Sequence, residues 1–122
     1  PGVLFNMLFA RAQAGDLELR TDGPFRGRTT QQLRQCFVAH VAGYIRDVQA
    51  YVMPWSAQLG AIKVKARIWH GAEDNWSPKA MAEYLGTALS GCAHVEIIPG
   101  LSHYSCLYQA VESVCAEIRA DC

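Results

Sequence analysis

The sequence has no long apolar run, no run of one charge and no paired cysteine motif. None of its apolar stretches reaches the roughly eighteen residues that a membrane-spanning helix needs. Eleven Lys and Arg residues balance eleven Asp and Glu residues, without the basic stripe that binds phosphate backbones. We therefore expect neither a membrane nor a nucleic acid as a partner.

Cysteine spacing argues against a disulfide framework or a zinc ribbon. The number of cysteines is odd, and no two of them form a C-x-x-C pair. We predict reduced thiols in a cytoplasmic protein. No H-E-x-x-H helix occurs either, so we expect no metal, and no motif indicates a cofactor. The cysteines are Cys36, Cys92, Cys106, Cys115 and Cys122.

The first third of the chain alternates between a helical pattern and a polar one. Residues 3–14 carry apolar side chains on one face, which predicts a helix that ends at Gly15. The stretch 16–28 is polar and contains glycines and a proline, which is typical of a loop.

A longer helix is predicted to follow. Thr29 and Gln32 have the spacing of a capping box, and apolar residues then recur every three or four positions. The sequence Met-Pro-Trp at 53–55 should end this helix, because proline disfavours helical backbone before it. We interpret residues 1–55 as a helical cap segment.

After Trp55 the pattern changes to strand, helix, strand and helix. Short apolar runs at 64–71 and 94–100 each end in glycine, as strands often do. Between them, Ser77 and Pro78 indicate the start of a helix, and a last helix follows His103.

A strand–helix–strand order predicts a parallel βαβ unit. Parallel strands are normally covered on both faces and belong to larger sheets, and two strands do not make one. We therefore predict an α/β fold in which residues 56–122 form an incomplete domain. An open strand edge invites strand addition, so we expect the chain not to be a self-sufficient monomer.

Two side chains that suit acid–base chemistry follow these strands. Asp74 lies in the loop after the first strand, and His103 lies in the turn after the second. Parallel strands end at the same edge of a sheet, so the two residues can meet there. A carboxylate that holds one imidazole nitrogen leaves the other free to take a proton from a nucleophile. Glu73 is a competitor for the role of Asp74.

The residues from Ile62 to Ile118 resemble the C-terminal part of an α/β-hydrolase. "ARIWHGAEDNWSP" is similar to the strand and loop that carry the triad acid, and "VEIIPGLSH" to the strand and turn that carry the histidine. "MPWSAQL" resembles the segment that returns from the cap domain. The resemblance implies a hydrolase acting on a small molecule without a cofactor, with Asp74 as the triad acid and His103 as the base.

The nucleophile elbow of that family, G-x-S-x-G, is absent from the sequence. The stretch "GLSHY" at 100–104 begins like an elbow but ends in Tyr104. The resemblance therefore implies that this chain is a fragment. The nucleophile would lie on the missing N-terminal part of the same protein, or a second chain would complete the sheet.

Other interpretations remain open at this point. A metal site from His70, Asp74 and His103 is conceivable, and Cys106, one helical turn after His103, suggests a Cys–His dyad. Trp76 is a candidate for a hydrophobic staple, or for the mouth of a substrate site. The protein is alternatively a non-catalytic binding module, or a relative whose reaction is not hydrolysis.

Overall fold

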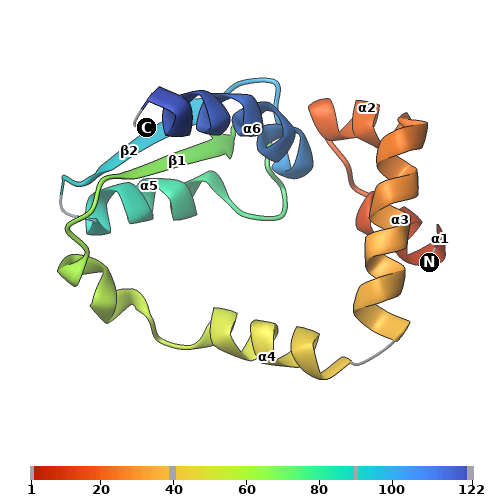
Figure 1. The fold of residues 1–122 in the computed structure, drawn as a ribbon, viewed down its shortest axis with the longest axis horizontal. Helices are drawn as coiled ribbons and strands as arrows, with labels where there is room; N and C mark the ends of the chain where they lie inside the picture. The colour runs from red at the N-terminus through yellow and green to blue at the C-terminus, as the bar shows by residue number, and fades with distance from the viewer. Residues whose placement is uncertain (1, 39–40, 90, 121–122) are drawn as a thin grey trace.

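The computed structural model describes residues 2–38, 41–89 and 91–120. Most of this part is helical, and its only strands are β1 (Ala66–Gly71) and β2 (Ala93–Ile98), as Figure 1 shows. The helices are α1 (Gly2–Leu8), α2 (Gly15–Thr21), α3 (Gly23–Val38), α4 (Val41–Val52), the 3₁₀ helix η1 (Ser56–Ala61), α5 (Lys79–Ala88) and α6 (His103–Ala120).

The predicted fold class is wrong. The sequence patterns led us to expect an α/β fold, the C-terminal part of an α/β-hydrolase with a share of a larger sheet. The structure is instead a small helix-rich domain with a two-stranded sheet. The reason is that the periodicity outside β1 and β2 is helical, so the described residues provide no third strand.

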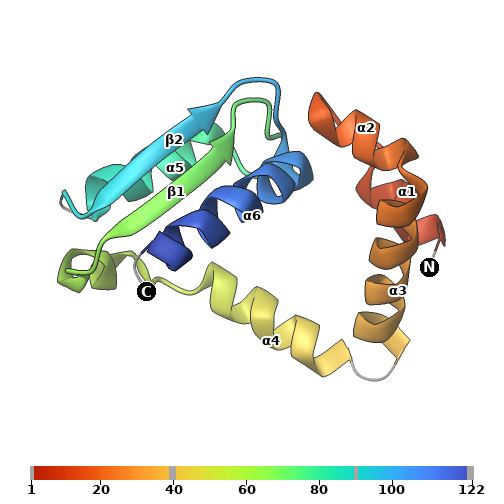
Figure 2. The same cartoon turned by 45° about the horizontal axis from the view of Figure 1, so that its top comes forward.

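The two strands are parallel, with Ala66 opposite Ala93 and Gly71 opposite Ile98. Helix α5 connects them and covers one face of the sheet, and α6 covers the other face (Figures 1 and 2). Because both strands run in one direction, the loops that follow them leave from the same edge. This edge holds both residues that the sequence singled out.

The N-terminal helices pack onto the first turn of α6. Phe5, Phe9 and Phe25 form their buried cluster, and the ring centroids of Phe5 and Phe9 are 4.7 Å apart. Tyr104 packs against this cluster, with its ring centroid 5.0 Å from that of Phe9. Aromatic pairs at such distances add stability beyond the area that they bury. The cluster therefore fixes α1 to α3 beside the residue that follows His103.

Two local predictions in the N-terminal region are also wrong. Gly15 begins α2 rather than ending a helix, and the stretch 16–28 holds α2 and the start of α3 rather than a loop. The carboxylate of Asp22 accepts a hydrogen bond from the Phe25 N–H, which caps α3. Pro24 lies in the first turn of α3, where proline has no N–H to lose from the helix.

The capping box predicted at Thr29 and Gln32 is not a helix start, because both residues lie inside α3. The long helix predicted to follow it passes through residues 39–40, which lie outside the described residues. Its predicted end is confirmed, since α4 ends at Val52, immediately before the Met-Pro-Trp sequence.

Helix α4 has a different environment from the others, because none of its residues is buried. In both cartoon views it lies away from the sheet (Figures 1 and 2). No helix in the described part of the chain is long and apolar enough to cross a membrane. The large apolar side chains that α4 exposes are Val41, Tyr44, Ile45, Val48, Tyr51 and Val52.

Candidate functional site

The loops after β1 and β2 are tied together by backbone hydrogen bonds. The Ala72 N–H donates to the Ile98 carbonyl at 3.0 Å, and the Glu73 N–H donates to the Leu101 carbonyl at 3.0 Å. Gly71 allows this close approach, because a Cβ atom there would collide with the Leu101 carbonyl. Sequence and local geometry thus place the two loops in contact before any side chain is considered.

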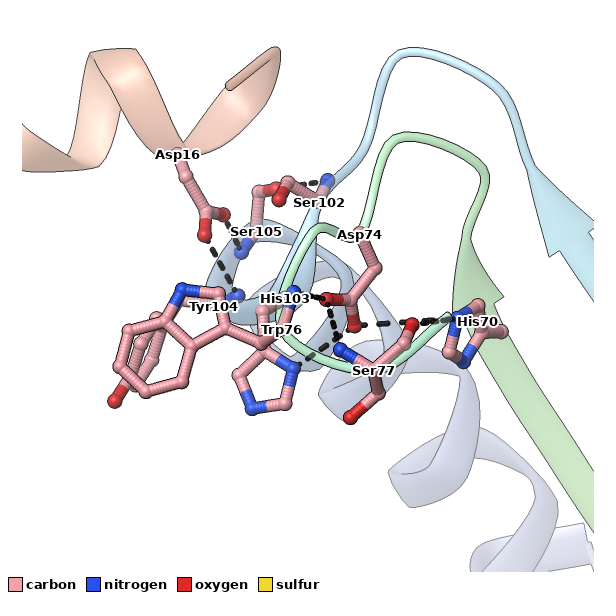
Figure 3. A network of polar contacts seen from close by, with 9 residues as sticks. All are labelled: Asp16, His70, Asp74, Trp76, Ser77, Ser102, His103, Tyr104 and Ser105. Atoms are coloured by element: carbon pink, nitrogen blue, oxygen red, sulfur yellow. Dashed lines mark hydrogen bonds and ion pairs between the residues drawn. The ribbon is translucent and has the colours of Figure 1, made fainter. Parts of the chain in front are cut away.

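Asp74 is the centre of the site (Figure 3). Its Oδ1 atom accepts hydrogen bonds from the Trp76 N–H at 2.8 Å and the Ser77 N–H at 2.9 Å, which forms an Asx turn. Its Oδ2 atom lies 2.8 Å from Nδ1 of His103. The juxtaposition of Asp74 and His103 that the sequence predicted is therefore present. Glu73, the competing acid, is exposed.

The hydrogen bonds decide the protonation state of Asp74. Burial opposes its charged form, but the Ser77 N–H, the His103 ring and the Trp76 N–H together outweigh burial, and the pKa of Asp74 is lowered. A carboxylate can only accept a hydrogen bond. Nδ1 of His103 therefore carries a hydrogen atom and donates a hydrogen bond to Asp74. The second ring nitrogen, Nε2, is then the one available for chemistry.

Aromatic rings surround the His103 imidazole. The Trp76 indole stacks on it with centroids 5.6 Å apart, and Tyr104 meets it edge-on at 5.2 Å. Trp76 itself is 43% exposed. These two contacts restrict rotation of the imidazole ring and add to the restraint from Asp74.

His70 lies on the other side of Asp74. Its Nε2 atom is 2.9 Å from the Ser77 carbonyl, to which it donates, and 4.0 Å from Oδ2 of Asp74. This arrangement is that of a hydrogen-bonded core histidine. Within the described residues no group of three or more His, Cys, Asp and Glu side chains could hold a metal ion.

Cys106 does not have the properties of an activated nucleophile. It is buried, and burial raises the pKa of its thiol. The negative charges of Asp74, Asp16 and Glu96 raise this pKa further. A reactive cysteine needs an electropositive and accessible environment, whereas the environment of Cys106 is buried and electronegative. The geometry therefore favours a packed thiol over the Cys–His dyad.

Sequence reasoning missed Asp16, which it assigned to a polar loop. This residue is 1% exposed, and its carboxylate accepts hydrogen bonds from the backbone N–H groups of Tyr104 and Ser105. No local pattern indicates the contact, because it joins residues 89 positions apart. Burial, and then the charge of Asp16, raises the pKa of the Tyr104 phenol.

A groove of about 650 Å³ opens between β1 and α6. Both Asp74 and His103 line it, and His103 is the accessible member of the pair, since the Asp74 side chain is buried. The rest of its lining is largely apolar and includes Trp69, Leu107 and Val111. An apolar groove with a few polar groups is the usual form of a small-molecule site.

The chain matches no protein-family model, no curated protein and no solved structure. The resemblance to α/β-hydrolases therefore depends on the sequence motifs alone. What the structure adds is the geometry of two residues in those motifs, Asp74 and His103.

Proposed function

We propose that His103 is the general base of a hydrolase that cleaves an ester, an amide or a similar bond, and that Asp74 is the carboxylate that orients it. The observation that carries this proposal is the 2.8 Å contact between Oδ2 of Asp74 and Nδ1 of His103. It fixes the imidazole in the tautomer that a general base requires. The His103 side chain is 39% exposed, so a substrate can reach it.

The chemistry follows from the two ring nitrogens. Asp74 holds the Nδ1 proton, so the Nε2 lone pair takes a proton from the attacking hydroxyl or thiol, and the imidazolium that forms is stabilised by the carboxylate. The same proton is then delivered to the leaving group. The nucleophile and the oxyanion donors come from sequence outside this chain, since no nucleophile elbow is present.

The free edge of β1 supports a partner that supplies these groups. Among the described strands, β1 pairs only with β2, so its other edge has unpaired N–H and C=O groups. The groove between β1 and α6 lies beside the candidate pair. A preceding segment of the same protein, or a second chain, would bind here and bring the nucleophile to Nε2 of His103.

The test uses the full translation product of the encoding gene beside the 122-residue chain. We expect p-nitrophenyl ester hydrolysis in the longer protein, reduced by orders of magnitude in both Asp74→Asn and His103→Ala. The 122-residue chain should be inactive, because it lacks a nucleophile and an oxyanion hole. Full activity of both variants in the longer protein would refute the proposal.

A non-catalytic interaction module is the second candidate, and the exposed apolar face of α4 favours it. Sedimentation velocity at low micromolar concentration distinguishes the hydrolase hypothesis from the interaction-module hypothesis. The hydrolase fragment should form dimers or aggregates, or bind an added N-terminal fragment, because its apolar surface and strand edge are open. A compact monomer with cooperative melting, and no gain of activity on adding that fragment, would favour the interaction module.

A further inference from the structure

Asp16 caps the helix that begins with His103. It is the second residue of α2, and its Oδ1 atom accepts a hydrogen bond from the Ser105 N–H at 2.6 Å. Its Oδ2 atom accepts from the Tyr104 N–H at 3.1 Å. The first N–H groups of a helix have no partner within the helix, so a negative charge at this place stabilises the first turn. Figure 3 shows the carboxylate pointing at this turn from the separate helix α2.

The residue before Asp16 fixes the turn that leads into α6. The Gly15 N–H donates to the Gly100 carbonyl at 3.1 Å. A Cβ atom at position 15 would lie 2.8 Å from Cβ of Ser105, so only glycine fits this approach. The Ser105 hydroxyl in turn accepts from the Ser102 N–H at 2.8 Å. Gly15 and Asp16 thus hold the backbone on both sides of His103.

These contacts affect His103 because its ring and its backbone are restrained separately. Asp74 and Trp76 orient the imidazole ring, and the contacts to Asp16 fix the backbone from which the ring extends. A displacement of the first turn of α6 would move Nδ1 away from Asp74, whose position is set independently by the loop after β1. The 2.8 Å contact joins these two restraints, one on the ring and one on the backbone.

We propose that Asp16 is a positioning residue, which holds the first turn of α6 so that His103 stays aligned with Asp74. The catalytic consequence rests on the proposed function, whereas the alignment itself does not. Asp16 is a buried residue of α2, so it acts through the backbone of Tyr104 and Ser105 and not on a substrate.

The variants are Asp16→Ala, which removes both acceptors, and Asp16→Asn, which keeps one. The matched control is Asp22→Ala. Asp22 also caps a helix, since its Oδ1 atom accepts from the Phe25 N–H at 2.5 Å, but the helix is α3. Loss of either cap should lower the free energy of unfolding by about 1 kcal/mol, which is the usual value of a capping residue. If Asp16 has a purely structural role, its loss and the loss of Asp22 should have the same effect on His103.

The first measurement is the NMR signal of the His103 Nδ1 proton in the 122-residue chain. The second is the rate at which diethyl pyrocarbonate modifies His103, relative to the exposed His94 in the same sample. We expect Asp16→Ala to abolish the Nδ1 signal by exchange with water. It should also raise the rate ratio several-fold, because a ring released from Asp74 and Trp76 exposes both of its nitrogens to the reagent. Asp16→Asn should give an intermediate ratio, and Asp22→Ala the wild-type ratio.

A wild-type signal and ratio in a folded Asp16→Asn or Asp16→Ala protein would overturn the proposal, as would an equal change in Asp22→Ala. If Asp16→Ala does not fold, Asp16→Asn alone decides, because it retains one acceptor. In the longer active protein, Asp16→Asn should lower kcat and leave KM unchanged. If the hydrolase proposal fails, the NMR and modification results still stand, so the two failures are distinguishable.

Discussion

The indole of Trp76 stacks on the imidazole of His103, and the backbone N–H of Trp76 binds the same carboxylate as that imidazole. The ring planes are inclined by 17°, and the shared carboxylate is that of Asp74. One acidic residue therefore fixes both the base and the ring that covers it. Loss of the carboxylate charge should disturb both at once.

Asp74 should make folding stability depend on acid pH. Its pKa is lowered in the folded state, so its contribution is complete above about pH 4, the usual pKa of an unfolded carboxyl, and is lost as the pH falls through the lowered value. We expect Asp74→Asn to lower the free energy of unfolding by about 2 kcal/mol at pH 7. Urea unfolding at pH 7 and pH 3 should show this difference shrinking in acid. An equal difference at both pH values would contradict the charge-based explanation.

Gly71→Ala should separate the two loops of the site. The new Cβ atom would overlap the Leu101 carbonyl, and relief of this overlap costs about 1–3 kcal/mol of unfolding free energy. Gly43→Ala is the control, because nothing lies within 4 Å of a Cβ atom there and alanine favours the helix α4. Urea unfolding should show opposite signs for the two variants. Similar effects at both positions would mean that the close approach at Gly71 is unimportant.

Ala14→Gly should stabilise the chain. Ala14 precedes α2 with φ 45° and ψ −133°, a backbone conformation that favours glycine. Removal of this strain should raise the free energy of unfolding by about 1 kcal/mol. Ala116→Gly, at an exposed position in the C-terminal half of α6, should instead lower it by about 1 kcal/mol. Thermal melting measures both, and a lower melting temperature for Ala14→Gly would disprove the strain.

Cys106 should react slowly with iodoacetamide. Burial and neighbouring negative charges raise the pKa of its thiol, whereas Cys115 on the same helix is exposed. Mass spectrometry with fragmentation should show that Cys115 and the likewise exposed Cys36 are labelled before Cys106. Faster labelling of Cys106, abolished by His103→Ala, would support the Cys–His dyad against the geometry described above.

The relation between Asp74 and His103 was predictable because it depends on strand direction. Two parallel strands end at one edge, and the turn residues at Gly71 and Gly100 mark those ends in the sequence. The Asx turn was also within reach of sequence reasoning, since Asp74 precedes Trp76 and Ser77 at the spacing that such turns use. The catalytic role of the pair remains a proposal.

The fold class and the N-terminal region were not predictable in the same way. Apolar periodicity identifies a helix face but not what covers it, so it could not reveal that α4 has no buried residue. The number of strands in a sheet is a property of long-range pairing, and the βαβ pattern alone suggested more strands than the two observed. The role of Asp16 depends on a contact across most of the chain and has no local signal.

The distance in sequence between Asp16 and Ser105 has a consequence for how the chain folds. These residues are 89 positions apart, whereas Asp74 and His103 are 29 apart. Closing the longer loop costs about 1 kcal/mol more chain entropy than closing the shorter one. Contacts of long sequence separation also slow folding. During synthesis from the N-terminus, Asp16 leaves the ribosome long before its partners, so the site cannot be completed until α6 has been made.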